Sequence, residues 1–464
     1  MELITNQDII SGYLTDASNT HGHADALIRP RNTREVVEIV QMAQKYNIPI
    51  TVTAQRTSTT GGPVPNGGWL LSTERLNVIH SDTHVDGGVI LGEYQRHLER
   101  KGLLFPPDPT SRNECSIGAC ASCNASGARS FRYGATRPWI ERMEVVLPNG
   151  DVRIVDRNTP IPEHWPKIHW IEPDVKTSAG YSSTNNLLDL MIGQEGTLGI
   201  ITQVWTKVIP LPKDVLGMIV YFSTLEDCLS CVVELRNGAV RPFQEGSPGS
   251  LSPRAIEFFD ARSIVLMRSR VDVPSHANCG LFVEVEHDGD LDLDPWFDVF
   301  ERHHALCDDI IAAENEEERE RLYRVRHAIP AGVNEQIIAN GMPKVGTDFS
   351  VPDSGLRAMM KAYDAVTMPS VLFGHIGDNH LHLNLLPRNA VELKEAKALY
   401  VQLAHKAVEL GGSVSAEHGI GKIKKGLLAH MVGTDVVHSF QALKSVVDPK
   451  WILGRGVLFE KNNT

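Results

Sequence analysis

Residues 374–384 read Gly-His-Ile-Gly-Asp-Asn-His-Leu-His-Leu-Asn, and this stretch indicates a β-strand that carries a metal site. Polar and apolar residues alternate after the Gly-Asp-Asn turn, which is the pattern of a strand with two different faces. His380, His382 and Asn384 therefore share one face of the predicted strand. His375 lies just before the turn, which can fold the chain back so that this histidine approaches the polar face.

A carboxylate that could complete the site follows in the sequence Glu417-His418-Gly419. Together, His375, His382 and Glu417 supply two imidazoles and one carboxylate, a set that suits a divalent transition metal with an open coordination position. His418 stands beside the carboxylate, where it could move a proton to or from the molecule in that position. The alternative is a strand with a polar outer face and a solvated Glu-His pair. Three histidines within eight residues make that the weaker interpretation.

The length and composition are those of a globular protein with more than one domain. A chain of 464 residues suggests roughly two to four domains, and 42% hydrophobic with 22% charged residues is typical of soluble globular proteins. The formal net charge of −12 argues against a nucleic-acid partner, because its phosphates would be repelled. No apolar run is long enough to span a bilayer, and the first residues lack the features of a signal peptide. We therefore expect a cytoplasmic protein without an integral membrane segment.

The seven cysteines do not form the pattern of a disulfide framework, because their number is odd and their spacing irregular. Two pairs have the Cys-x-x-Cys spacing, Cys120 with Cys123 and Cys228 with Cys231. A zinc or redox function remains open for each pair. We favour buried filler residues, because the first pair lies in a run of small residues and the second on the apolar face of a predicted helix at 225–235.

Three loops rich in glycine or hydroxyl groups lie in the first half of the chain. Residues 54–62 follow a predicted buried strand at 48–53, and their N–H and hydroxyl groups could bind an anion such as a pyrophosphate. The loops at 116–127 and 193–200 contain small residues that let the backbone approach a flat or phosphorylated ligand. None has a Gly-x-Gly-x-x-Gly or Walker pattern, which argues against Rossmann and P-loop folds.

Local patterns predict further regular elements. A helix is expected at 34–46, capped by Asn32, and another at 94–101. Strands are expected at 68–72, 88–91, 219–222, 281–286 and 380–386.

The ordered motifs of this chain resemble those of a known flavoprotein family. Residues 105–109 (Phe-Pro-Pro-Asp-Pro), 117–127, 132–134 (Arg-Tyr-Gly) and 193–200 resemble the FAD-binding domain of the vanillyl-alcohol-oxidase superfamily. Residues 374–384 and 416–421 (Ala-Glu-His-Gly-Ile-Gly) resemble the C-terminal domain of its D-2-hydroxyacid dehydrogenase branch. That branch contains the D-lactate dehydrogenases, the glycolate oxidase flavoprotein subunit and the D-2-hydroxyglutarate dehydrogenases.

The resemblance implies an α+β fold in two parts. Residues 1–210 would form a PCMH-type FAD-binding domain of two subdomains. Residues 211–464 would form a cap domain with an antiparallel sheet and helices, of the FAD-linked oxidase C-terminal type. The final segment, from about residue 419 to residue 464, would return to the FAD domain.

The resemblance also assigns residues to FAD. The pyrophosphate would lie on Gln55, Arg56, Thr57, Ser58, Thr60 and Gly61. The ribityl chain and isoalloxazine ring would be lined by Pro107, Asp108, Ser116, Gly118, Cys123, Asn124 and Ser126. The adenosine end would be held by Glu195, Gly196, Gly199 and Ile200. The family often has His-Asn where this chain has Gln-Arg at 55–56, so we expect FAD to bind without a covalent histidyl link.

In the cap domain, the resemblance implies the following assignments. The metal ligands, for Zn or Mn, would be His375, His382 and Glu417, and the catalytic base would be His418. The substrate-binding residues would be Arg326, Lys344, His380 and Asn384. Relatives usually have Gly-Asn at positions 379–380. The histidine found here could be an extra metal ligand or could support one, but we favour a place in the substrate pocket or on the strand surface, outside the metal ligands.

The implied activity is oxidation of a D-2-hydroxy acid to the 2-oxo acid. The metal would chelate the substrate, His418 would accept the hydroxyl proton, and hydride would pass to flavin N5. Electrons would leave to an electron-transfer flavoprotein, a quinone or a cytochrome, and a homodimer is left open. The alternatives are an oxidase that uses O2, an ether-lipid-type flavoenzyme without net redox, and a flavin-binding subunit with a vestigial site.

Overall fold

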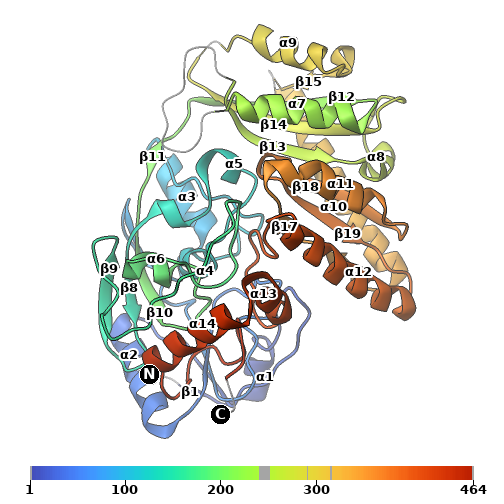
Figure 1. The fold of residues 1–464 in the computed structure, drawn as a ribbon. Coiled ribbons are helices and arrows are strands. Elements are labelled where there is room, and N and C mark those ends of the chain that lie inside the picture. The colour runs from blue at the N-terminus through green and yellow to red at the C-terminus, as the bar shows by residue number, and fades with distance from the viewer. Residues whose placement is uncertain (1–2, 240–250, 290, 314–315, 462–464) are drawn as a thin grey trace.

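The computed structural model describes residues 3–239, 251–289, 291–313 and 316–461 of the chain. Figure 1 shows the blue, teal and red segments in one part of the molecule and most of the yellow and orange segments in the other. Within the described ranges, no helix combines the length and the apolar character that a membrane crossing requires.

Two sheets lie in the part formed mainly by the first half of the chain (Figure 1). The smaller sheet has the order β1-β2-β4-β3, with β1 Leu3–Ile4, β2 Ala26–Ile28, β3 Ile50–Thr53 and β4 Trp69–Ser72. The larger, antiparallel sheet has the order β5-β6-β10-β8-β9, with β5 Ile79–Ser81, β6 His84–Asp86, β8 Ile140–Val146, β9 Val152–Asp156 and β10 Ile200–Thr206. A separate two-stranded pair joins β7 Leu103–Leu104 to β11 Ile209–Pro210.

Helix α2, Thr33–Tyr46, is the crossover that places β2 and β3 on either side of β4, each parallel to it. The Asn32 side chain caps the helix by accepting a hydrogen bond from the Glu35 N–H, and the stripe of Val36, Ile39 and Val40 is buried. The predicted helix at 34–46 and the strands at 48–53 and 68–72 are therefore confirmed, with boundaries shifted by one or two residues.

The strand predicted at 88–91 is wrong. The Gly88 N–H donates to the Leu76 carbonyl at 2.7 Å, and the Val89 carbonyl accepts from the N–H of Ile117, the first residue of α4, at 2.9 Å. Ile90 forms only an isolated bridge with Ser116, so these residues do not build a strand. Helix α3, Leu91–Glu99, begins directly after them, earlier than the expected 94–101. The remaining helices of this part are α1 Gln7–Ser11, α4 Ile117–Cys123, α5 Ser130–Tyr133, η1 Arg137–Trp139 and α6 Leu187–Met191.

An eight-stranded antiparallel sheet forms the centre of the other part. Its order is β15-β12-β14-β13-β18-β19-β16, and β17 also pairs with β19. The strands are β12 Asp214–Phe222, β13 Pro253–Phe259, β14 Cys279–His287, β15 Ile311–Ala312, β16 Val345–Gly346, β17 Phe349–Ser350, β18 Ser370–His375 and β19 His380–Leu385. The strands predicted at 219–222, 281–286 and 380–386 lie in β12, β14 and β19, which confirms them.

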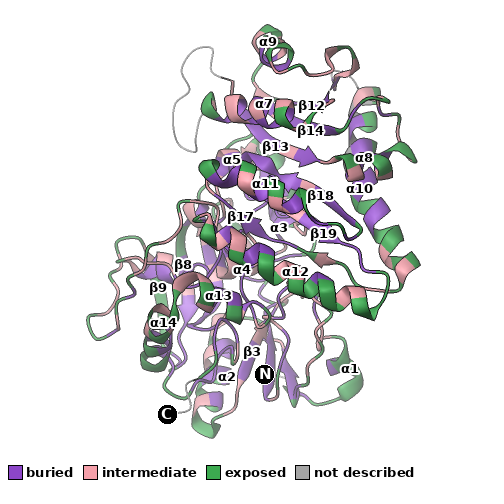
Figure 2. Ribbon diagram, turned by 45° about the vertical axis from the view of Figure 1, so that its right-hand side comes forward, coloured by how far each residue is buried: buried purple, intermediate pink, exposed green. Residues whose placement is uncertain are grey.

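Helices cover this sheet, and Figure 2 shows buried strands beside helices whose outer faces are exposed. The helices are α7 Leu225–Asn237, α8 Ala261–Arg268, α9 Asp294–Arg302, η2 Cys307–Asp309, α10 Glu316–Asn340, η3 Asp353–Gly355, α11 Leu356–Asp364, η4 Ile376–Asp378 and α12 Ala390–Glu409. Cys228 and Cys231 are fully buried on α7, as the filler interpretation expects. All seven cysteines lie in described ranges and are free.

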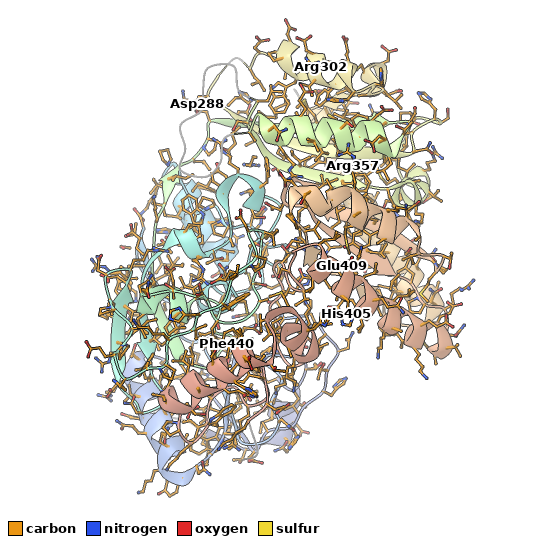
Figure 3. The ribbon with its side chains drawn as sticks, in the orientation of Figure 1. Asp288, Arg302, Arg357, His405, Glu409 and Phe440 are labelled. Atoms are coloured by element: carbon orange, nitrogen blue, oxygen red, sulfur yellow. The ribbon has the colours of Figure 1, made fainter. Side chains whose placement is uncertain are left out.

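The C-terminal helices α13, Lys425–Val432, and α14, Thr434–Val447, lie beside the first part of the chain (Figure 1). Phe440 of α14, labelled in Figure 3, packs on Tyr181 with ring centroids 5.2 Å apart. Leu453 forms a parallel bridge with Ile50 of β3. The boundary at 210/211 and the extent of the returning segment stay predictions.

Replacing Lys444 by methionine is expected to destabilise the packing of this segment. Lys444 is 1% exposed, and its ammonium donates to Asp448 at 2.5 Å and to the carbonyls of Thr197 and Leu453 at 2.6 and 3.0 Å. Methionine would leave a buried carboxylate without its cation, at a cost of about 3–5 kcal/mol. Urea unfolding followed by circular dichroism measures the loss. The matched Lys450→Met at an exposed position should change stability by about 0.5 kcal/mol or less, and equal midpoints for both variants would contradict the prediction.

Candidate functional site

The β18–β19 hairpin brings His375 and His382 together. β18 ends at His375, and η4 with Asn379 in the left-handed conformation (φ 50°) reverses the chain before β19. The Nδ1–H of His375 donates to Glu257 at 2.6 Å, and that of His382 donates to the Thr347 carbonyl at 2.8 Å. The Nε2 atoms then lie 3.7 and 3.4 Å from the Glu417 carboxylate. A hydrogen bond on the far nitrogen is how proteins orient a metal-binding imidazole.

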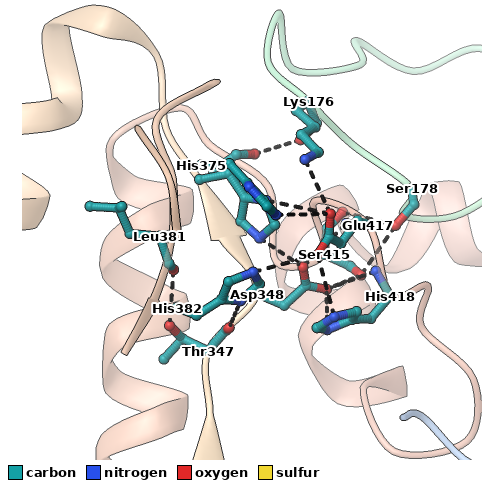
Figure 4. A network of polar contacts seen from close by, with 12 residues as sticks. Lys176, Ser178, Thr347, Asp348, His375, Leu381, His382, Ser415, Glu417 and His418 are labelled. Atoms are coloured by element: carbon teal, nitrogen blue, oxygen red, sulfur yellow. Dashed lines mark hydrogen bonds and ion pairs between the residues drawn. The ribbon is translucent and has the colours of Figure 1, made fainter. Parts of the chain in front are cut away.

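Glu417 and His418 lie on a loop that Asp348 holds in place (Figure 4). The backbone N–H groups of both residues donate to the Asp348 carboxylate, at 3.2 and 3.1 Å. His418 also directs Nδ1 at Asp348 (3.4 Å) and Nε2 at Glu417 (3.6 Å), and its side chain is 34% exposed. The loop therefore presents a carboxylate and an accessible imidazole side by side.

His380 is completely buried, which excludes a position on the strand surface. Its Nε2 lies 3.0 Å from Asp348 Oδ1, and its Nδ1 lies 3.9 Å from Glu417 Oε2. Among the described residues, neither ring nitrogen makes a hydrogen bond of good geometry. The assignment of His380 to substrate binding stays a prediction.

Buried charges around the site set its protonation. Burial alone would raise the pKa of Glu417, but Lys176 at 3.1 Å and the neighbouring imidazoles hold it well below its ordinary value. Burial opposes protonation of His375, yet Glu257 and Glu417 raise its pKa to about 9. Burial lowers the pKa of His418, so this imidazole is neutral at pH 7.

The donor set fits a divalent metal. One ligand atom from each of His375, His380, His382 and Glu417 lies within 4.8 Å of the others, among the residues that the structure describes. The carboxylate is charged, and two imidazoles have their far nitrogens held by acceptors. His375 would have to release a proton on binding the metal, because only the neutral imidazole is a ligand.

A cavity of about 550 Å³ opens next to this cluster and reaches Glu417 and His418. Three chain segments line it, residues 52–63, 109–126 and 194–201, which contain the glycine-rich loops. Of the residues assigned to FAD, those that line it are Gln55, Arg56, Thr57, Ser58, Ser116, Gly118, Cys123, Ser126, Glu195, Gly196 and Gly199.

The other residues assigned to FAD brace the loops instead. They are Thr60, Gly61, Pro107, Asp108, Asn124 and Ile200, and none is among the residues that line the cavity. Asp108 pairs with Arg112 and Arg129 at 2.7 and 3.2 Å, and the Asn124 side chain accepts from the Arg137 N–H at 2.9 Å. Their assignment stays a prediction.

The cavity fits a polar, elongated cofactor such as FAD. Thr53 Oγ1, Gln55 Oε1 and Ser126 Oγ are buried, border the cavity, and lack hydrogen-bond partners among the described residues. Buried polar atoms of this kind are costly unless a ligand satisfies them. Glu195 joins the cavity to the loop that carries Glu417, because its carboxylate accepts the N–H groups of Ile420 and Gly421 at 2.8 and 2.7 Å. Burial raises the pKa of Glu195 to about 7.

The residues assigned to the substrate are only partly brought together. Lys344 donates to the side-chain oxygen of Asn384 at 2.7 Å, so these two residues are adjacent. Arg326 belongs to α10, and its side chain lies outside the described residues.

The sequence did not indicate Lys176, which is 5% exposed and points at Glu417 from the loop before α6 (Figure 4). It also did not indicate Asp348 and Glu257, which hold Glu417, His418 and His375, or Lys424, which pairs with Asp348 at 2.6 Å. These three residues lie in segments without a recognisable motif.

Two family models match this chain, one in each of its two parts. Residues 24–156 match the family model described as FAD binding domain. Residues 211–458 match the model described as FAD linked oxidases, C-terminal domain.

Several curated proteins are similar over nearly the whole chain. A D-lactate dehydrogenase of Anaerostipes hadrus is 29% identical, covering 99% of this chain and 95% of that protein. The glycolate oxidase subunit GlcD of Bacillus subtilis is 28% identical, covering 94% and 89%. A D-2-hydroxyglutarate dehydrogenase of Stutzerimonas stutzeri is 25% identical, covering 99% and 96%.

A solved alkyldihydroxyacetonephosphate synthase shares the fold, with a TM-score of 0.65. The match covers 93% of this chain and 77% of that one. At 18% identity this likeness concerns the fold alone.

Proposed function

The chain belongs to the FAD linked oxidases, and from this premise we propose that it oxidises a D-2-hydroxy acid to the 2-oxo acid. One observation carries the proposal. The cavity lined by residues 52–63, 109–126 and 194–201 reaches Glu417, which is a member of the donor cluster, and His418 beside it. A flavin in the cavity and a substrate held at the cluster would therefore be neighbours. The similar dehydrogenases and the glycolate oxidase subunit favour this substrate class.

We propose His375, His382 and Glu417 as ligands of a divalent metal, Zn or Mn. When bound, the metal would supply Lewis-acid polarisation of the substrate hydroxyl, and non-covalent FAD would supply the hydride acceptor. His418 takes the hydroxyl proton, because its imidazole is neutral at pH 7 and accessible from the cavity. Asp348, 3.4 Å from His418 Nδ1, stabilises the imidazolium that forms.

Positive and amide groups around the cluster would orient the carboxylate of the substrate. Lys176 is buried next to Glu417. Asn384 lies on β19, the strand that carries His382, and Lys344, just before β16, donates to its side-chain oxygen. These groups, together with Arg326 and His380, are the proposed substrate contacts. A fixed carboxylate turns the Cα hydrogen of one enantiomer toward the flavin cavity, which gives the site its stereochemical preference.

A panel of hydroxy acids tests the proposed function. Under anaerobic conditions, D-2-hydroxy acids are expected to bleach the flavin absorbance of the purified protein, and their L-enantiomers are expected to leave it unchanged. Lactate, glycolate and 2-hydroxyglutarate cover small and acidic side chains, and metal content is measured on the same samples. A protein with full FAD and metal that no D-2-hydroxy acid reduces would refute the proposal.

A dehydrogenase and an oxidase differ in the molecule that accepts electrons from the reduced flavin. We propose an electron-transfer flavoprotein, a quinone or a cytochrome, because most of the similar relatives above are named dehydrogenases. Stopped-flow mixing of the reduced flavin with air decides between the two. Reoxidation much slower than steady-state turnover with an artificial acceptor supports a dehydrogenase, and equally fast reoxidation identifies an oxidase.

A further inference from the structure

His380 is the imidazole of the cluster that the proposed function leaves without a chemical task at the metal. Its side chain is 0% exposed, and its ring lies 5.3 Å from that of His375 and 4.5 Å from that of His382, measured between centroids. Its Nδ1 lies 3.9 Å from Glu417 Oε2, and neither ring nitrogen makes a hydrogen bond of good geometry among the described residues. A fully buried nitrogen without a partner is costly, so it points to a ligand that the protein binds.

The surroundings of His380 match those of the other two imidazoles. His375 and His382 each hold one ring nitrogen against an oxygen acceptor and direct the other at Glu417. The arrangement of His380 is similar with its nitrogens exchanged, because Nε2 lies 3.0 Å from Asp348 Oδ1, close to it but without hydrogen-bond geometry, while Nδ1 faces Glu417. An acceptor behind the ring fixes the tautomer whose free nitrogen can coordinate a metal.

We propose that His380 is a third imidazole ligand, through Nδ1, of the metal site on which the proposed function rests. The site would then offer three imidazoles and one carboxylate. An octahedral metal bound this way keeps two positions, the number that the hydroxyl and one carboxylate oxygen of a 2-hydroxy acid require. A nitrogen-rich set also favours Zn over Mn, because imidazole suits Zn whereas carboxylate and water suit Mn.

The competing interpretation is that His380 only supports Asp348 through Nε2. Replacing His380 by asparagine separates the two roles, because asparagine keeps a side-chain N–H donor but removes the imidazole. His405→Asn is the matched control, since His405 lies on α12 (Figure 3), is exposed, stacks on His430 at 3.8 Å between ring centroids, and does not belong to the donor cluster.

The test uses the FAD-loaded full chain, freed of metal by chelation and reloaded with Zn. X-ray absorption at the Zn edge should count three imidazoles in the wild-type protein and in His405→Asn, and two in His380→Asn. The Zn dissociation constant of His380→Asn should rise by about 100-fold or more, because even partners outside the ligand set cost 10–100-fold when lost. The preference for Zn over Mn, from the ratio of their dissociation constants, should narrow in the same variant.

The outcomes separate this inference from the proposed function. Two imidazoles in the wild-type protein, or unchanged Zn affinity in His380→Asn, would overturn the third ligand and leave the proposed metal site standing. A wild-type protein that binds no metal would overturn both. If thermal unfolding shows that metal-free His380→Asn is not folded, His380→Gln replaces it. The number of imidazoles bound to Zn in the wild-type protein then decides whether His380 is a ligand.

Discussion

Glu417→Gln is expected to lose the metal and nearly all turnover while keeping FAD. Glutamine has almost the same shape but no charge, and Glu417 is the carboxylate toward which His375 and His382 direct their Nε2 atoms at 3.7 and 3.4 Å. Loss of the metal removes several kcal/mol of stabilisation from the developing alkoxide, so kcat/KM should fall by about 1,000-fold or more. Metal content by mass spectrometry, flavin absorbance and turnover of a D-2-hydroxy acid measure the three effects on one sample.

The control for this substitution is Glu409→Gln at the end of α12 (Figure 3). Glu409 is exposed and pairs only with Lys406 among the described residues, at 3.0 Å, so metal content and turnover should equal those of the wild-type protein. Added Zn should restore part of the activity of Glu417→Gln, because the imidazoles remain. Wild-type metal content together with wild-type turnover in Glu417→Gln would eliminate this carboxylate as a ligand.

The local pattern of the histidine-rich segment was sufficient to predict its geometry. Alternation placed His382 and Asn384 on one face, and the turn returned His375 toward it. The groups that hold these residues could not be predicted, because they come from distant segments. Asp348 is 69 positions from Glu417, and Lys176 is 241 positions from it. Such contacts follow from the order of strands in the sheet, which a single sequence does not specify.

For the loops at 54–62, 116–127 and 193–200, the sequence likewise predicted the segments but not the directions of individual side chains. The glycine and hydroxyl pattern predicted which segments line the cavity, because close approach of a backbone requires small residues. It did not predict which side chains face inward. Asp108 turns to Arg112 and Arg129, and Ile200 points into the core of the sheet, although both belong to motifs of the family. The strand prediction at 88–91 was wrong because these residues bond to a turn and to the start of α4 and form only an isolated bridge, at Ile90.

Glu195 links the two halves of the site in a way that neither motif reveals alone. It lies in the Gly-Gln-Glu-Gly loop with φ 52°, and its carboxylate accepts the N–H groups of Ile420 and Gly421, just after the Glu-His-Gly sequence. A Cβ at Gly419 would come within 2.9 Å of that carboxylate, so glycine is required there. The loop that presents Glu417 and His418 is therefore held at Glu417 and His418 by Asp348, and at Ile420 and Gly421 by Glu195, which lines the cavity.

His418→Ala is expected to keep FAD and metal but to lose turnover by about 100- to 10,000-fold, the range that a general base contributes. In the wild-type structure the backbone N–H of His418 donates to Asp348 at 3.1 Å. The alanine variant keeps this N–H, so the loop should keep its position. The lost imidazole is 34% exposed, so the space it leaves can be reached from solvent. Added imidazole should therefore restore part of the rate, which a purely structural role would not allow.

Three measurements on His418→Ala decide the assignment: flavin absorbance, metal content and the rate of flavin bleaching by a D-2-hydroxy acid. His405→Ala, an exposed histidine on α12, should match the wild-type protein in all three. An unchanged bleaching rate in a variant with full FAD and metal would exclude His418 as the base. The proton would then have to reach another neutral acceptor near the cluster.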